Sequence, residues 1–253
     1  MGSAVHQRAA LQQLLSHPDE DKRVGAVLLD FDGPVTDLFR DESTAPVARR
    51  IKETVRKFWG QLDRDVETCD DSHGILRCLR DMYDRPAPQR LDPQALMAAE
   101  KIVTDYEYEV VESAVPAPHV LRLIDVLSER KLPLVIVSNN ADGPIWEFFK
   151  REKVQRQEKV AAVVGRDPLL RSMKPAPDSV RYAVDLLGTR PECCLLVGDQ
   201  VTDLQAAQRA GTPFLGYTQS PEREERMLGL GAYSVVSSHD PLIKAVESLS
   251  STN

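Results

Sequence analysis

The sequence has little of what several classes of protein require. Its 253 residues carry 39 acidic and 32 basic side chains, a formal net charge of −7, so it lacks the basic surface on which general nucleic-acid binders and binders of anionic membranes depend. It has four cysteines and no Cys-x-x-Cys pair, which is typical of buried thiols in a reducing compartment. No apolar run is long enough to cross a bilayer. We therefore expect a cytoplasmic protein that binds neither nucleic acid nor membrane.

Short apolar runs recur along the chain and predict six buried strands. They lack strict alternation of apolar and polar residues, as do strands that are covered on both faces. Helical patterns separate the last five, and one of these helices is predicted to begin after an N-cap at Thr202 and to end at Gly211. Alternating strands and helices indicate an α/β fold with a doubly wound parallel sheet. The predicted strands are residues 25–31, 132–139, 160–165, 193–199, 212–217 and 232–236.

One long stretch interrupts this alternation. Residues 38–115 contain no convincing strand but at least three helical patterns, enough to bury an apolar face of their own. We predict a helical domain at 38–115, inserted into a core domain formed by 24–37 and 116–253. Residues 1–23 are predicted to form an N-terminal helical extension.

Polar side chains gather where the predicted strands end. In an open parallel sheet, ligands bind outside the carboxyl ends of the strands. Carboxylates there form a hard, all-oxygen environment of the kind that suits Mg²⁺, and a hydroxyl, backbone N–H groups and a lysine would bind phosphate oxygens. Gly33 would let the chain turn close to the site. The candidate residues at this edge are Asp30, Asp32, Ser138, Asn139, Lys174, Asp199 and Asp203.

Four segments carry a resemblance to a known family: "LLDFDGPVTD", "VIVSNN", "KPAPD" and "LLVGDQVTD". In this order they resemble the motifs of the haloacid dehalogenase-like (HAD) superfamily, over residues 24 to 217. The chain is most similar to the phosphatase branch with a helical cap after the first motif, which includes phosphoglycolate phosphatases and β-phosphoglucomutases. The resemblance implies a Rossmann-like core, a helical cap domain and a small-molecule phosphate ester as substrate.

The resemblance also implies a role for each matching residue. Asp30 would be the nucleophile and form an aspartyl-phosphate, and Asp32 would be the general acid and base. Mg²⁺ would be held by Asp30, Asp199 and the backbone carbonyl of Asp32. Asp203 would orient Lys174 or a metal-bound water. The catalytic and phosphate-binding set would be completed by Gly33, Ser138, Asn139 and Lys174.

Other reactions of the same family remain open at this stage. A dehalogenase lacks an acid two residues after the nucleophile, so Asp32 favours phosphoryl chemistry. A phosphonoacetaldehyde hydrolase needs a cap lysine, for which Lys52 and Lys57 are available. A phosphosugar mutase shares all four motifs, and a non-catalytic binding module would keep the fold without turnover. His73 is a candidate for either a substrate contact or a helix cap. A monomer and a homodimer are both compatible with the sequence.

Overall fold

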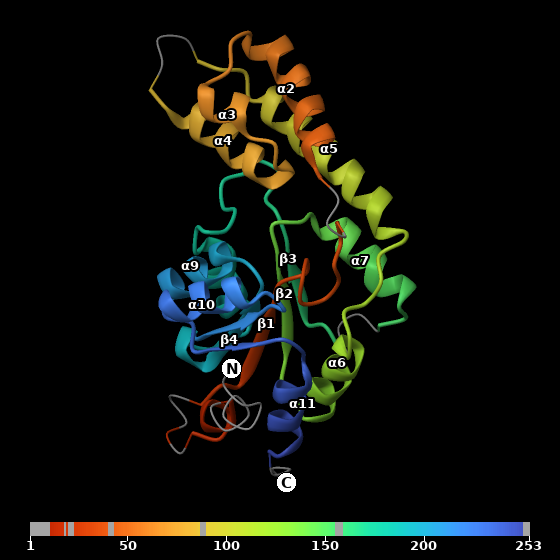
Figure 1. Cartoon of the computed structure of the whole chain (residues 1–253), viewed down its shortest axis with the longest axis vertical. Coiled ribbons are helices and arrows are strands. Elements are labelled where there is room, and N and C mark those ends of the chain that lie inside the picture. Colours follow the sequence, from red (N-terminus) through yellow and green to blue (C-terminus); the bar gives the residue numbers. More distant parts are fainter. Residues whose placement is uncertain are drawn as a thin grey trace.

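A computed structural model describes residues 11–17, 19, 23–39, 43–86, 90–154 and 159–249. Its centre is a six-stranded parallel sheet with the strand order β3-β2-β1-β4-β5-β6 (Figure 1). All six predicted strands are present, and the predicted α/β class with a doubly wound parallel sheet is confirmed. The strands are β1 (Ala26–Leu29), β2 (Leu134–Val137), β3 (Ala162–Val164), β4 (Cys194–Gly198), β5 (Phe214–Tyr217) and β6 (Ser234–Val236).

Helices cover both faces of this sheet. Val27 and Leu29 of β1 pack in one apolar cluster with residues of α6 (Val120–Glu129), α7 (Asp142–Arg151) and α11 (Asp240–Glu247). The alternate residues Ala26 and Leu28 pack in a second cluster on the other face. That cluster includes residues of α8 (Asp178–Leu186), α9 (Val201–Ala210) and α10 (Pro221–Gly229). Because successive strand side chains point to opposite faces, β1 is buried on both, which explains its unbroken apolar sequence.

The start of α9 differs from the prediction. Thr202 is not the N-cap, because Gln200 occupies the capping position and the helix begins at Val201, two residues earlier than predicted. Gln200 and Asp203 form a capping box, in which the Asp203 carboxylate accepts a hydrogen bond from the Gln200 N–H at 2.9 Å. The predicted end is confirmed, since Gly211 is left-handed with φ 83°.

A helical unit lies beyond the carboxyl ends of the strands (Figure 1). Its members are α2 (Ala45–Trp59), α3 (Arg64–Thr68), α4 (Ser72–Asp84) and α5 (Gln94–Val111). They share an apolar cluster that includes Ile51, Leu79 and Val103. The sequence predicted three of them and missed α3, whose five residues are too few for a periodic pattern.

The two connections between the helical unit and the sheet run side by side. Thr36 and Pro116 form an isolated β-bridge, the Thr36 hydroxyl donates to the Val115 carbonyl at 2.8 Å, and the Ala117 N–H donates to the Val35 carbonyl at 2.8 Å. The predicted boundaries of a helical domain at 38–115 remain a prediction.

Two further predictions concern the N-terminal extension and the absence of a membrane-spanning segment. Of the predicted N-terminal extension, residues 1–10, 18 and 20–22 lie outside the described residues, while residues 11–15 are helical and place Leu11 and Leu15 in the core. Among the helices that the structure describes, none has the length and apolar character needed to traverse a membrane.

Candidate active site

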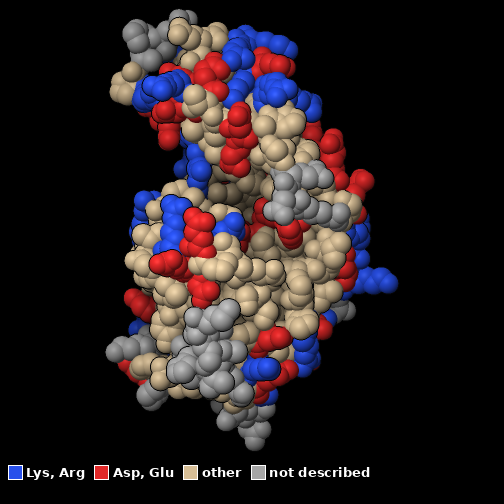
Figure 2. Space-filling view, in the orientation of Figure 1, with Lys and Arg blue, Asp and Glu red and all other residues tan. Residues whose placement is uncertain are grey.

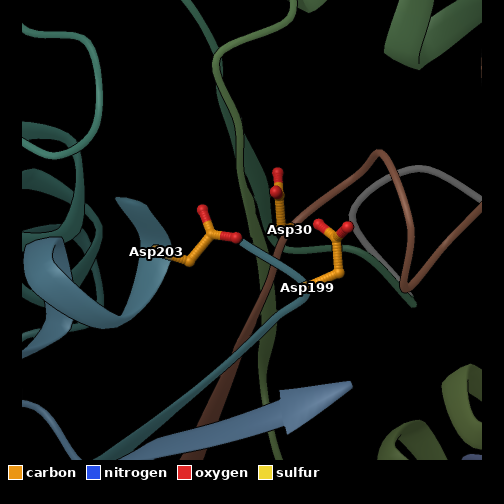
Figure 3. A group of neighbouring side chains, drawn as sticks. All are labelled: Asp30, Asp199 and Asp203. Carbon is orange, nitrogen blue, oxygen red and sulfur yellow. The ribbon is translucent and has the colours of Figure 1, made fainter. Parts of the chain in front are cut away.

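Three aspartates from separate segments meet at the carboxyl edge of the sheet. Asp30 follows β1, Asp199 follows β4, and Asp203 lies in the first turn of α9. Each can offer a carboxylate oxygen such that the three oxygens lie within 4.8 Å of one another. Figure 3 shows the three side chains turned into one space from these different segments. Because β1 and β4 are neighbouring parallel strands, Asp30 lies close to Asp199 and Asp203 although it is far from them in the sequence.

Lys174 supplies a positive charge to this cluster. Its Nζ lies 2.6 Å from Oδ1 of Asp203 and 2.9 Å from Oδ1 of Asp30, and it donates to the Val137 carbonyl at 3.0 Å. The side chain is 1% exposed. Burial alone would lower the pKa of the Lys174 amine, but the two carboxylates outweigh it and hold that pKa above its ordinary value. Lys174 therefore stays charged and joins the acids of two segments.

One lysine does not neutralise the cluster. Burial, followed by the charge of Asp203, raises the pKa of Asp30 to about 7. Burial and the charges of Asp203 and Asp30 raise the pKa of Asp199 to about 8, although Arg223 lies 3.1 Å from its Oδ2. These acids are close to one another, hard and short of positive charge, which is the donor chemistry that a Mg²⁺ site requires.

Asp32 has a different environment from Asp30. Its Oδ1 accepts the Leu38 N–H at 2.8 Å, and among the described residues its carboxylate is not part of the three-acid cluster. Burial raises the pKa of Asp32 to about 6, against the opposing effects of the Leu38 hydrogen bond and of His73. An acid with such a pKa exchanges a proton near neutral pH, as a general acid and base must.

The loop after β2 and the turn after β1 complete this edge. Ser138 is buried, and its hydroxyl donates to Oδ1 of Asn140 at 2.9 Å; it also lies near enough to Asp30 to oppose the rise in the pKa of that acid. The Asn139 side chain accepts the Lys174 N–H at 2.7 Å and donates to the Lys174 carbonyl at 3.1 Å. It thus holds the lysine-bearing loop, leaving its own backbone N–H as the group for a ligand.

Gly33 is required by space as well as by conformation. Its φ is +95°, and a Cβ there would lie 2.6 Å from Cγ of Asp199. A side chain at this position would displace the very carboxylate that the cluster needs. We predicted that the chain turns close to the site at Gly33 because glycine has no Cβ. The distance to Asp199 shows that a Cβ would not fit there.

These residues surround a cavity of about 300 Å³ between the sheet and the helical unit. The space-filling view shows the molecule hollowed between these two parts (Figure 2). From the helical side, Asp71, His73 and Arg77 line the cavity, and Phe39 lines it from the segment before α2. Of the residues predicted for the site, the lining includes Asp30, Asp32, Ser138, Asn139, Lys174, Asp199 and Asp203.

The sequence analysis predicted some of the residues that the helical unit contributes to the cavity and missed others. His73 was a candidate, whereas Arg77, one helical turn later on α4, was not; its spacing of four residues from His73 was the available signal. Lys52 is 8% exposed, and its Nζ binds Asp70 at 3.0 Å and the Glu67 carbonyl at 2.8 Å. It is not among the residues that line the cavity, which does not favour an imine-forming lysine there.

Comparison with known proteins agrees with this geometry. A family model of haloacid dehalogenase-like hydrolases matches residues 24–211. The chain therefore belongs to the haloacid dehalogenase-like hydrolase family, and the resemblance carried by the four sequence motifs is confirmed.

Individual relatives are more distant. The chain is 28% identical to the phosphoglycolate phosphatase of Shigella boydii over 174 residues, which are 68% of this chain and 58% of that protein. It is 30% identical over 139 residues to that of Rhodospirillum rubrum, covering 53% of this chain and 54% of the relative. The chain thus spans little more than half the length of these curated relatives.

Solved structures share the fold at lower identity. The structure of CbbY from Rhodobacter sphaeroides, in complex with phosphate, superposes with a TM-score of 0.60 at 19% identity, covering 88% of this chain and 99% of that one. A HAD-superfamily hydrolase from Geobacter sulfurreducens gives a TM-score of 0.53 at 19% identity, covering 88% and 96%. At such identities the likeness shows the fold.

Proposed function

We propose that this chain is a Mg²⁺-dependent phosphomonoester hydrolase that works through an aspartyl-phosphate on Asp30. One observation carries the proposal. The carboxylate of Asp30, at the end of strand β1, lies within 2.9 Å of the Lys174 amine and beside Ser138, and both of these residues line the same cavity. A nucleophile placed beside a cation and a hydroxyl donor is an arrangement that can receive a phosphoryl group.

The chemistry would proceed in two displacements. An Asp30 oxygen attacks phosphorus, the bond from phosphorus to the leaving oxygen breaks, and Asp32 gives its proton to that oxygen. Asp32 then takes a proton from water, the water oxygen bonds to phosphorus, and the bond to Asp30 breaks to release inorganic phosphate. The raised pKa of Asp32, about 6, suits a group that must both give and take a proton near neutrality.

The three-acid cluster fits a magnesium ion. Asp30, Asp199 and the backbone carbonyl of Asp32 would hold it, with Asp203 directed to Lys174 by the 2.6 Å ion pair. Bound Mg²⁺ would offset the repulsion between the Asp30 carboxylate and an anionic phosphate. Ser138, the backbone N–H of Asn139, and Lys174 would bind the phosphoryl oxygens.

The substrate that we propose is a small phosphomonoester with a second anionic group. The cavity of about 300 Å³ admits only a small molecule. His73 and Arg77 line it from the helical unit, beside Asp71, and these two side chains can bind an anionic tail. The curated relatives are phosphoglycolate phosphatases, so 2-phosphoglycolate is the first substrate to test.

The decisive experiment measures phosphate release from 2-phosphoglycolate, sugar phosphates and an aryl phosphate, with Mg²⁺ or with EDTA. We expect turnover that EDTA abolishes and that Asp30→Asn abolishes. Asp105→Asn, which alters a partly exposed acid on α5 that does not line the cavity, is the matched control and should keep its rate. An Asp30→Asn variant as active as the wild type would refute the nucleophile. A folded protein that binds Mg²⁺ but turns over nothing would refute the hydrolase.

A further inference from the structure

Another acid, Glu107, lies against the loop after β2 and takes no part in the proposed chemistry. It stands on α5, and its side chain is fully buried. Oε1 is bound by Nε2 of His73 at 2.9 Å and by Nδ2 of Asn140 at 3.1 Å. Oε2 accepts the Ala141 N–H at 3.0 Å. One carboxylate thus contacts a helix of the helical unit and the loop after β2.

Arg166 supplies the opposite charge from the segment after β3. Its two terminal nitrogens lie 2.7 and 3.2 Å from the oxygens of Glu107, and its guanidinium is fully buried. It also donates to the Asn139 carbonyl at 2.7 Å and to Oε1 of Glu100 at 3.0 Å. A buried, bidentate pair of this kind fixes geometry as well as charge.

Burial would raise the pKa of Glu107, but Arg166 and His73 outweigh it and lower that pKa to about 2. The carboxylate is therefore ionised and can only accept hydrogen bonds. It follows that Nε2 of His73 must carry a hydrogen, which leaves Nδ1 as the ring nitrogen that Glu107 does not bind. When the ring is protonated, Nδ1 can donate to an anionic oxygen.

The contacts continue from Glu107 to the nucleophile. Asn140, held by Glu107, accepts a hydrogen bond from the Ser138 hydroxyl at 2.9 Å, and its own N–H donates to that hydroxyl at 3.2 Å. Ser138 in turn lies beside Asp30 in the cavity lining. His73 lines the cavity on the opposite side. Both walls of the cavity thus depend on the same buried carboxylate.

We propose that Glu107 is a positioning residue, which sets the tautomer and orientation of His73 and, through Asn140 and Ala141, the place of the loop 138–141. With one hydrogen held on Nε2 by Glu107 and a second on Nδ1, His73 would thereby donate to the distal anionic group of the substrate, while Ser138 meets the phosphoryl group. The kinetic part of this proposal rests on the proposed hydrolase function; the tautomer of His73 does not.

The test compares Glu107→Gln with Glu100→Gln. Both variants remove one negative charge from α5 and one partner of Arg166, but Glu100 contacts neither His73 nor the loop 138–141 in the interactions described. For Glu107→Gln we expect kcat to fall about ten- to hundred-fold on both 2-phosphoglycolate and an aryl phosphate, because the loop is misplaced. KM should rise for 2-phosphoglycolate alone, since the aryl phosphate has no distal anion for His73. Glu100→Gln should leave kcat and KM within about two-fold of the wild type on both.

If Glu107 had only a structural role, the variant would have a lower melting temperature, but its KM would not change for 2-phosphoglycolate alone. A double variant gives a second check: in a His73→Gln background, Glu107→Gln should raise the KM for 2-phosphoglycolate no further. If Glu107→Gln does not fold, Glu107→Asp, which keeps the charge but shortens its reach, replaces it with the same expected split. Equal kinetics for the Glu107 and Glu100 variants would overturn the proposal.

Nitrogen NMR of the imidazole rings tests the proposal without any substrate. The ¹⁵N shifts of His73, assigned by comparison with His73→Gln, should report hydrogen on Nε2 in the wild type and a mixed tautomer in the Glu107 variant. A wild-type ring with hydrogen on Nδ1 alone would overturn the proposal even if the protein is an active phosphatase. The expected tautomer in a protein without turnover would instead fail the proposed function and leave the role of Glu107 standing.

Discussion

Replacing Lys174 by methionine should destabilise the protein far more than the loss of one surface charge would. Methionine keeps much of the apolar length of lysine but removes the amine that contacts Asp30, Asp203 and the Val137 carbonyl. Two carboxylates then remain buried without their shared cation. Asp30 is already difficult to ionise, with a pKa near 7, and losing the cation raises that pKa further.

The size of the effect follows from the burial of the pair. Removing one partner of a buried ion pair costs about 3–5 kcal/mol. For a chain of this size each kcal/mol lowers the melting temperature by about 2–4 °C, so we expect a fall of about 6–20 °C. Because the pKa of Asp30 is higher in the folded than in the unfolded state, protonation of Asp30 stabilises the folded state. That stabilisation is lost as pH rises through the pKa of the folded state. The deficit should therefore grow from about pH 5.5 to about pH 8.

Thermal unfolding of Lys174→Met without added metal, at both pH values, measures this directly. Lys159→Met is the control, because Lys159 pairs with Asp125 at 2.7 Å but is 32% exposed, and such a pair contributes about 1 kcal/mol or less. A Lys174→Met protein that melts with the wild type at both pH values would show that the amine does not hold the acids.

Three further results are expected from the same site and its surroundings. Without metal, the wild type should lose stability as pH rises from about 5 to 8, since burial raises the pKa values of Asp30 and Asp199 from 3.8 to about 7 and about 8. Added MgCl₂ should restore more of this stability at the higher pH. An Asp199→Asn protein that MgCl₂ stabilises as much as the wild type would contradict this. Gly33→Ala should raise the Mg²⁺ concentration needed for thermal stabilisation, because its Cβ would lie 2.6 Å from Cγ of Asp199; an unchanged Mg²⁺ titration would refute that reasoning. His239 is buried against the Pro34 carbonyl, and its pKa is lowered from 6.5 to about 4, chiefly by burial. The free energy of unfolding of the wild type should therefore exceed that of His239→Gln by about 3 kcal/mol less at about pH 4 than at about pH 6.5, as measured by denaturant unfolding. A difference in unfolding free energy that does not change with pH would argue against a neutral ring.

The sheet could be predicted because burial on two faces leaves a direct trace in the sequence. The run at 25–31 predicts β1, and the ladder occupies Ala26–Leu29 within it. The prediction extends too far because Phe31 is apolar and buried although the strand has already ended. The acids after the strands were also predictable, since parallel strands bring their carboxyl ends to one edge.

The network around Glu107 could not be predicted in the same way. Its members, His73, Glu107, Asn140 and Arg166, come from four separate segments, and no short motif joins them. One signal was available. Glu107 stands four residues after Val103 and four before Val111, which are both buried on α5, so a glutamate interrupts an apolar stripe. A charge at such a position requires a buried partner, but the sequence does not say that the partner is Arg166.

Charge explains why the two networks behave differently. Glu107 and Glu100 share Arg166, and Glu107 also has His73, so the pKa of Glu107 is lowered to about 2. At the strand ends, Lys174 and Arg223 face the acids Asp30, Asp32, Asp199 and Asp203, and three of these have raised pKa values. In the first network the buried carboxylate of Glu107 is paired with Arg166 of the chain itself, and such a pair can fix positions permanently. The second is left short of positive charge, so a cation that joined it would lower the pKa values of its acids and favour the ionised Asp30 that the proposed attack requires.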